Sequence, residues 1–274
     1  MQFGDELSVE EYGPGDLIFE QAQFSLMKMY YISQGSVDIF KQRAGKRHFL
    51  VNIPAKEFFG EIGLLNKFRV ATALAGKEGT RLIAINDKNF HVLAAKGNFL
   101  FQLLKKSAFR LYLSEIKLLK LAELNPNLGI EFNEEKVSIG DLDILAYDKT
   151  LPSKTLLKKS IILKKGEDPG KRIFYVSEGN VSLYLYHAKQ KEEAATLTPG
   201  EFFGKLDMEF DAEHKFELVV SSDSAKVVIM HYNRFTKLLT ENPDLHLHCL
   251  KTVLWRLNIT EQKIEYYVEN GKGE

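Results

Sequence analysis

The sequence has almost no cysteine, no net charge and no long apolar run. Its 274 residues include one cysteine, Cys249, so the chain can form no internal disulfide and no thiolate zinc cluster. The 37 basic and 37 acidic residues cancel, which argues against binding duplex DNA through phosphate neutralisation alone. With 45% hydrophobic residues, the composition also differs from that of a disordered protein.

Two targeting signals are missing as well. No run of about 18 uncharged apolar residues could span a bilayer, and the N-terminus lacks the basic and apolar regions of a secretory signal. We therefore expect a soluble, cytoplasmic protein without a membrane partner. The length is about twice that of a typical domain, which favours two domains.

The chain contains an internal repeat with an offset of 144 residues. Three segments of the first copy and their counterparts in the second carry it: 17–19 with 161–163, 31–37 with 175–181, and 57–60 with 201–204. Further on the offset becomes 145, so the first copy lacks one residue. The repeat predicts domains at 1–124 and 156–274, and a linker over 125–155 with a possible short strand near 137–139.

Each copy begins with short β-branched and aromatic runs and ends in a helical pattern. Residues 29–32, 36–41 and 49–53 are typical of strands, while residues 13–16 and 76–79 carry turn residues. This spacing predicts a compact antiparallel sandwich or barrel. The helical pattern spans residues 99–124 in the first copy and has apolar residues mostly three, four or seven apart. In the second copy the same spacing links Leu250, Val253, Leu254, Leu257 and Ile264.

The strongest candidate site lies between two strand regions, at residues 58–72. Gly60 precedes a short amphipathic turn, whose free backbone N–H groups would favour an anion. Arg69 follows Glu61 by eight residues and could close over the same anion, while the Glu61 carboxylate could accept hydrogen bonds from ligand hydroxyls. The pattern predicts a pocket for a sugar phosphate.

The sequence here resembles the cyclic nucleotide-binding domain family, found in bacterial catabolite-activator proteins and in regulatory subunits of cyclic-nucleotide-dependent protein kinases. The family's phosphate-binding cassette reads Phe-Gly-Glu, a small residue, paired aliphatics, a spacer and Arg-x-Ala, an order that residues 59–65 and 69–71 follow. The resemblance covers both copies. It implies a mainly β fold with flanking helices (α+β), in which two tandem antiparallel, jelly-roll-like β-rolls are each followed by a long helix.

The resemblance also implies a role for each cassette residue. Glu61 would bind the ribose 2′-hydroxyl and Arg69 the exocyclic phosphate oxygens, with backbone amides of Gly60, Ile62 and Ala71 completing the cradle. Three apolar residues would wall the base and ribose: Ile39, Leu50 and Ile53.

Two further positions bear on the choice of base. Val70 cannot accept a hydrogen bond from the guanine amino group, which favours cAMP over cGMP. Ser114, on the helix after the roll, matches the position from which family members reach the base edge.

The two copies depart from the family pattern in different ways. In the first, the spacer between Leu65 and Arg69 is one residue short and Phe68 replaces the usual proline, so Arg69 could be aimed slightly off the usual position. In the second, Lys205 replaces the glutamate and residues 213–215 stand where the arginine would be. We expect the second copy to be degenerate; the alternative is that it binds another anion through Lys205 and Lys215.

Other readings of the same residues are simpler. Glu61 and Arg69 could form only a surface ion pair, which is worth about 0–1 kcal/mol. His246, His248 and Cys249 suggest a metal site, but two histidines two residues apart on a helix face different directions, so core or partly exposed positions are expected. The leucines of the two long helices are expected in the core, with a dimer seam and a homodimer as the alternative.

We therefore expect a non-enzymatic signalling receptor that binds a cyclic mononucleotide and no other cofactor or metal. The helix over 99–124 would shift on binding and change its contact with the second domain or with an effector protein that the sequence does not identify. No helix-turn-helix pattern follows the long helices and no basic pseudosubstrate precedes Gly13, so direct DNA binding is not expected. The alternatives are a ligand-free adaptor built from two rolls, or binding of another anionic nucleotide. Enzyme function is third, since no nucleophile and base occur at a recognisable spacing.

Overall fold

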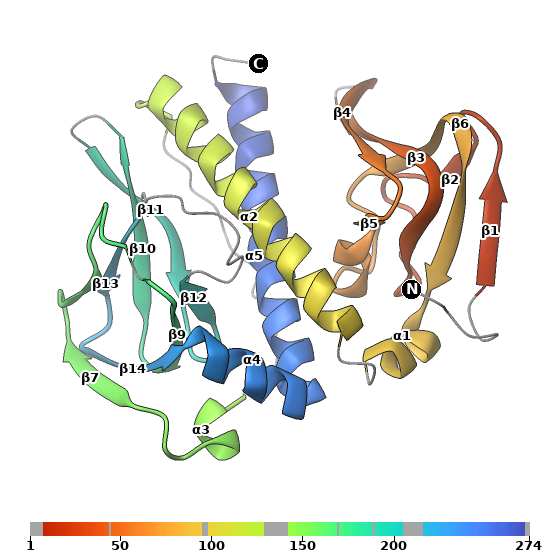
Figure 1. Cartoon of the computed structure of the whole chain (residues 1–274). Helices are drawn as coiled ribbons and strands as arrows, with labels where there is room; N and C mark the ends of the chain where they lie inside the picture. Colours follow the sequence, from red (N-terminus) through yellow and green to blue (C-terminus); the bar gives the residue numbers. More distant parts are fainter. Residues whose placement is uncertain are drawn as a thin grey trace. The chain divides into compact units, whose positions relative to one another are not determined.

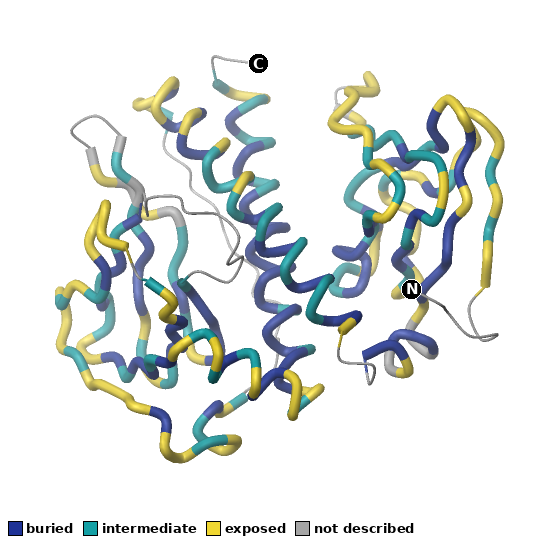
Figure 2. The backbone as a smooth tube through the Cα atoms, viewed as in Figure 1, coloured by how far each residue is buried: buried dark blue, intermediate teal, exposed yellow. Residues whose placement is uncertain are grey.

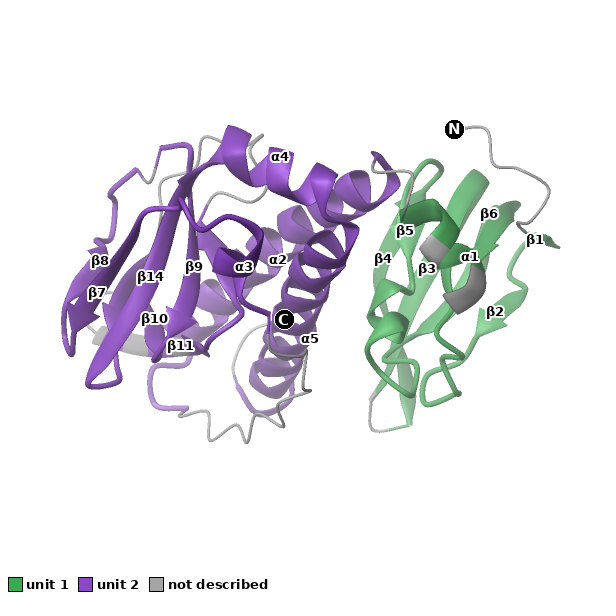
Figure 3. Ribbon diagram, turned by 90° about the horizontal axis from the view of Figure 1, so that it is seen from below, with its two compact units in different colours: residues 1–96 green, residues 97–274 purple. Residues whose placement is uncertain are grey.

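The computed structural model describes residues 8–43, 45–94, 98–128, 142–168, 170–187, 190–204 and 216–271. The chain divides into two compact units, unit 1 over residues 1–96 and unit 2 over residues 97–274 (Figure 3). Three of the sequence predictions fall outside the described residues: the possible strand near 137–139, Lys205, and residues 213–215.

Unit 1 is an antiparallel β-roll with one six-stranded sheet (Figure 1). Its strands are β1 (Ser8–Tyr12), β2 (Leu17–Phe19), β3 (Met29–Arg43), β4 (Lys46–Pro54), β5 (Phe58–Phe59) and β6 (Thr72–Ile85). The main path runs β1-β6-β3-β4, with β2 paired to β6 and β5 paired to β3. A 3-10 helix, η1 (Glu61–Leu64), lies between β5 and β6, and α1 (Asp87–Ala94) follows the roll.

The predicted turn at residues 76–79 is wrong, because β6 runs through it. The glycines there instead allow two long strands to approach closely: Gly35 and Gly79 have φ values of 78° and 74°. A Cβ atom added to Gly35 would lie 2.1 Å from the Gly79 carbonyl oxygen. The register between β3 and β6 shifts on both sides of Gly35, so these glycines accommodate an irregularity inside the sheet.

Unit 2 holds a second roll made of two four-stranded antiparallel sheets. One sheet has the order β11-β10-β13-β8 and contains β8 (Ile161–Leu163), β10 (Val181–His187), β11 (Gln190–Leu197) and β13 (Phe216–Val220). The other has the order β12-β9-β14-β7 and contains β7 (Ser153–Leu157), β9 (Arg172–Glu178), β12 (Phe202–Gly204) and β14 (Ser224–His231). Two short helices flank this roll, α3 (Ile144–Tyr147) and α4 (Tyr232–Glu241).

Both predicted long helices are present, as α2 (Asn98–Leu124) and α5 (Pro243–Asn270). All the leucines that defined the predicted seam of α2 are buried: Leu100, Leu103, Leu104, Leu111, Leu118 and Leu121. Helix α5 is buried along most of its length (Figure 2). Although the repeat groups α2 with the first roll, the compact units divide at residue 96, because the apolar face of α2 packs within unit 2.

Helices α2 and α5 lie side by side in the same direction (Figure 1). Near their N-termini the rings of Phe101 and His246 are 5.9 Å apart. Near their C-termini Leu121 and Tyr267 belong to one buried cluster. Because the residue numbers of the contacting pairs increase along both helices, α2 and α5 are parallel. Two helices that are equivalent in the repeat therefore pack against each other within one chain.

The residues that suggested a metal site are core residues of α5. His246, His248 and Cys249 are all buried, and His248 Nε2 lies 2.8 Å from the Gly200 carbonyl oxygen. In the described part of the chain, no group of three or more His, Cys, Asp or Glu residues could hold a metal ion. No described helix is both long and apolar enough to cross a membrane.

Candidate functional site

The cassette of unit 1 forms a compact turn between β5 and β6. Gly60 has a φ of 74° and precedes η1, so the chain turns sharply immediately after the buried aromatic pair of β5. All four residues of η1 are buried, including Glu61, whose side chain is drawn into the interior with only 2% of its surface exposed. A buried carboxylate requires polar or charged neighbours, and the charge of Glu61 acts on Arg69 of the same cassette.

Arg69 is also buried, with 6% of its surface exposed. Its Nη1 donates to the Gly60 carbonyl oxygen at 3.2 Å, and its Nη2 donates to the Ser25 carbonyl oxygen at 3.0 Å. Nε is buried and has no hydrogen-bond partner among the described residues. The guanidinium therefore keeps an unused donor inside the turn. An unsatisfied buried donor is costly and rare in folded proteins.

The guanidinium of Arg69 packs against a stack of aromatic rings. The carbon at its centre lies 4.2 Å from the centroid of the Phe19 ring and 5.9 Å from that of Tyr30. Phe19, Tyr30 and Phe59 stack on one another, with ring centroids 5.1–6.0 Å apart. Cation–π attraction of this kind strengthens when water is excluded, so the stack helps to hold a desolvated arginine in one orientation.

The loop between β2 and β3 holds the cassette from the other side. The backbone N–H of Arg69 donates to the Gln23 carbonyl at 2.7 Å, and the Arg69 carbonyl accepts from Ala22 at 2.9 Å. The Ser25 hydroxyl donates to the Asn66 carbonyl at 2.6 Å. Both the backbone and the side chain of Arg69 are thus fixed by a segment more than 40 residues earlier in the chain.

Small residues make the room that the guanidinium occupies. A Cβ atom added to Gly63 would lie 2.6 Å from Nη1 of Arg69, and one added to Gly60 would lie 3.0 Å from it. Residue 63 must therefore be glycine if the Arg69 guanidinium is to keep this position.

Burial lowers the pKa of Arg69, while the charges of Tyr30 and Glu61 oppose that shift. An arginine stays protonated at physiological pH even so. The site thus presents a desolvated cation next to a buried carboxylate. That combination can bind an anion through the cation and accept from neighbouring hydroxyls through the carboxylate.

The structure describes all of the remaining predicted site residues. Ile39 and Ile53 are half-buried on neighbouring strands and pack against the core of the roll. Leu50 is the extra residue where the β3–β4 register shifts, and 44% of its surface is exposed. Ile62 is buried, Val70 and Ala71 are half-buried beside Arg69, and Ser114 lies on α2 in unit 2.

Three groups that hold Arg69 have no recognisable signature in the sequence. Ser25 contributes a backbone carbonyl, which every residue possesses and which leaves no side-chain signature. Phe19 and Tyr30 are aromatic strand residues whose pattern predicts only a core position. Their stacking beneath a cation depends on the pairing of β2 and β3 with β6, which is a tertiary feature.

Comparison with known proteins follows the division of the chain into two rolls. The model of the cyclic nucleotide-binding domain family matches residues 9–96 and 153–242. A cAMP-dependent protein kinase regulatory subunit of Colletotrichum orbiculare is 25% identical over 219 residues, which cover 77% of this chain and 50% of the relative. The cAMP-activated global transcriptional regulator CRP of Salmonella typhimurium is 24% identical over 107 residues, which cover 39% of this chain and 50% of the relative.

Solved structures show similar but weaker matches. The regulatory subunit of a cAMP-independent protein kinase A from Trypanosoma brucei matches with 18% identity and a TM-score of 0.33, covering 96% of this chain and 84% of that one. The regulatory domain of Toxoplasma gondii PKA with cAMP matches with 15% identity and a TM-score of 0.31, covering 87% and 83%. The chain spans about half the length of the curated relatives it matches.

Proposed function

The chain belongs to the cyclic nucleotide-binding domain family, and we propose from this that unit 1 is the receptor for a cyclic mononucleotide. The observation that carries the proposal is the buried guanidinium of Arg69, which keeps an unused Nε donor within the family's cassette. A cyclic phosphate would supply the acceptor that this donor lacks and would compensate the desolvated charge. Glu61 would accept from the ribose 2′-hydroxyl, and the amides of Gly60, Ile62 and Ala71 would complete the cradle.

We infer cAMP rather than cGMP as the preferred ligand. Val70, half-buried next to Arg69, offers no acceptor or hydroxyl to the guanine amino group. The names of two curated relatives, a cAMP-dependent kinase subunit and a cAMP-activated transcriptional regulator, support the same choice. Ile39, Leu50 and Ile53 would then wall the adenine and ribose.

The role we propose is regulatory and non-enzymatic, in the cytoplasm. The names of these relatives describe a regulatory subunit and a regulator. Helix α2 begins four residues after the last residue of α1, so any ligand-linked change in unit 1 would be passed along the chain to this helix. A ligand shifts such an equilibrium only by its difference in affinity for the two states, so binding must favour one position of α2. The effector would be a protein that reads that position.

One observation favours a second function, that of a ligand-free adaptor. Both Nη atoms of Arg69 already donate to backbone carbonyls, those of Gly60 and Ser25, and the spacer before Arg69 is short. An arginine held in this way could serve only to brace the cassette. The two functions differ in whether Arg69 exchanges these bonds for a phosphate.

Titration calorimetry of the whole chain with cAMP and with cGMP separates the two functions. We expect heat with cAMP, weaker binding of cGMP, and loss of the heat in Arg69→Ala. Arg47→Ala, which removes an exposed arginine from β4, is the matched control and should bind as the wild type does. Absence of heat with both nucleotides at millimolar concentration would overturn the receptor proposal and leave the adaptor.

A further inference from the structure

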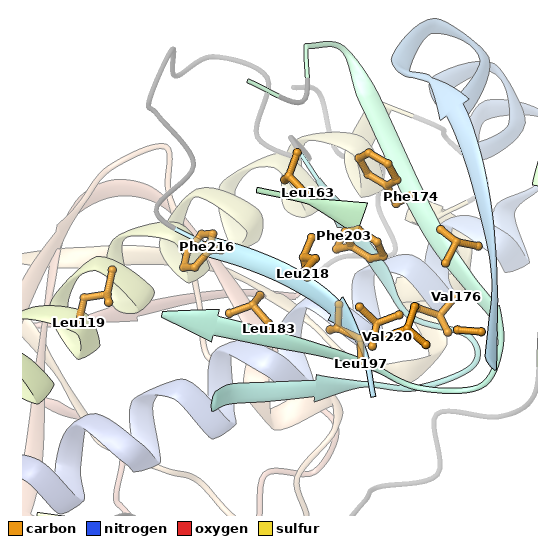
Figure 4. Packing of buried hydrophobic residues seen from close by; sticks show 13 residues of the cluster. Leu119, Leu163, Phe174, Val176, Leu183, Leu197, Phe203, Phe216, Leu218 and Val220 are labelled. Carbon is orange, nitrogen blue, oxygen red and sulfur yellow. The ribbon is translucent and has the colours of Figure 1, made fainter. Parts of the chain in front are cut away.

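Helix α2 packs against the interior of the second roll. Leu119 is 4% exposed and belongs to the same buried cluster as residues of β8, β9, β10, β11 and β13 (Figure 4). In that view it extends from α2 at the edge of the cluster, near Phe216 of β13. A residue of α2, the helix that directly follows unit 1, therefore completes the hydrophobic core of unit 2.

The residues around Leu119 are the second copy's equivalents of the pocket wall predicted in unit 1. By the repeat offset, Leu183 corresponds to Ile39 and Leu197 corresponds to Ile53. Leu183 and Leu197 are both buried in the cluster that contains Leu119. Ile39 and Ile53 of unit 1 are half-buried, whereas Leu183 and Leu197 of unit 2 are buried.

An ion pair between α2 and α5 also contacts strand β12 of the second roll. Arg256 of α5 contacts Glu115 of α2 with 2.6 Å between Nη2 and Oε1, and both side chains are largely buried. Nη1 of Arg256 also donates to the Phe202 carbonyl oxygen at 3.3 Å. Phe202 lies in β12, which in the repeat is the start of the second cassette. Arg256 thus joins α2, α5 and the cassette strand in one contact.

A small cavity lies between these elements. The described residues leave a cavity of about 20 Å³, lined by Glu115 and Leu118 of α2, Leu183, Phe216 and, on α5, Trp255 and Arg256. Such a volume holds about one water molecule, whereas pockets for small-molecule ligands are about 300–1,000 Å³.

We propose that α2 covers the pocket wall of the second roll that Leu183 and Leu197 form, and that the Glu115–Arg256 pair is the latch that keeps it there. Unit 2 is then a closed roll that takes no cyclic nucleotide while α2 is seated. This explains the second copy's loss of the cassette carboxylate without invoking another anion. The inference concerns unit 2 alone and does not depend on ligand binding by unit 1.

The test opens the latch in the whole chain and measures the exposed apolar pocket with the dye anilinonaphthalene sulfonate. The double variant Glu115→Ala/Leu119→Ala removes both the charge and the apolar plug. Its matched control, Leu113→Ala/Glu123→Ala, removes the same residue types from exposed positions of the same helix. We expect the double variant to keep cooperative thermal unfolding and to gain a saturable dye site with at least about fivefold higher fluorescence than the control. Equal dye binding by two cooperatively unfolding variants would overturn the proposal.

A single variant decides the matter if the double variant fails to unfold cooperatively. Glu115→Ala keeps the apolar face of α2, and its control is Glu123→Ala. Hydrogen exchange of backbone amides in β10 and β13 should be at least about tenfold faster in Glu115→Ala than in wild type, because the unlatched helix opens locally. Unchanged exchange in these two strands would show that α2 does not hold the roll closed, and the proposal would be abandoned.

Discussion

The guanidinium of Arg69 lies over the ring of Phe19, with 4.2 Å between the guanidinium carbon and the ring centroid. The contact joins a cassette residue to a strand 50 positions earlier in the chain. It places a cation on an apolar platform, and the carbonyls of Gly60 and Ser25 use two of its donors. The same arrangement has consequences for stability as well as for binding.

Removal of the Arg69 side chain should destabilise unit 1 even without ligand. Arg69→Ala leaves the Gly60 and Ser25 carbonyls without their donor, a loss of about 1–3 kcal/mol for buried groups. Thermal unfolding followed by circular dichroism should show a lower first transition for Arg69→Ala, whereas Arg47→Ala should match wild type. If Arg69→Ala were as stable as wild type, the buried hydrogen bonds of Arg69 would contribute nothing to the stability of unit 1.

Arg69→Lys separates charge from geometry. Lysine keeps the positive charge but lacks the planar fork of donors, so we expect cAMP affinity to fall at least about tenfold, or about 1.4 kcal/mol. Calorimetry at constant salt measures the change, and Arg47→Lys is the control. Undiminished affinity in Arg69→Lys would mean that the ligand senses only a point charge.

Gly63→Ala should displace Arg69. The new Cβ atom would lie 2.6 Å from Nη1 and 3.2 Å from Cβ of Ser25, so the guanidinium must move. We expect a loss of about 1–3 kcal/mol in stability from overpacking, together with weaker cAMP binding. In the control Gly13→Ala, the nearest atom is the end of the exposed Asp16 side chain at 3.1 Å, and we expect wild-type behaviour. Thermal unfolding and calorimetry on both variants test this.

The stability of unit 2 should depend on pH through His246. Burial lowers the pKa of His246 from 6.5 to about 4. The neutral form is therefore favoured in the folded state, so the stabilisation is complete above pH 6.5 and is lost as the pH falls toward 4, by up to about 3 kcal/mol. Chemical unfolding across this pH range should show a flatter profile for His246→Leu, whereas the exposed-residue control His48→Gln should retain the wild-type slope. Identical profiles in all three proteins would contradict the assignment.

Cys249 provides a label for opening of α5. The thiol is buried, and burial raises its pKa, so the reactive thiolate is scarce in the folded protein. We expect a disulfide reagent at pH 8 to label the native chain at least about a hundredfold more slowly than the unfolded chain. Rapid labelling of native protein would show that α5 opens readily, contrary to its burial.

Much of the fold could be predicted from the sequence because the signals are local or repeated. The offset of 144 residues indicated two rolls, and the apolar spacing in residues 99–124 indicated α2. The partner of α2 could not be predicted in this way, since buried leucines at helical spacing are equally compatible with the first roll and with α5. The turn expected at residues 76–79 failed for a related reason: glycine also serves where strands approach closely, and the sequence does not distinguish the two uses.

The candidate site was predictable only in part. The order of residues 59–71 pointed to Glu61 and Arg69, and both are buried in one turn. The short spacer indicated an altered aim for Arg69, but not that its Nη atoms would meet the carbonyls of Gly60 and Ser25. Those bonds arise from the loop between β2 and β3, whose approach to the cassette is set by the sheet and not by any local pattern.

A cyclic nucleotide should bind unit 1 and not unit 2. Equilibrium dialysis of the whole chain against labelled cAMP, at saturating concentration, measures the number of nucleotides bound per chain. We predict one equivalent in wild type and none in Arg69→Ala. Two equivalents would contradict the closed second roll, and no binding by wild type would contradict the receptor function of unit 1.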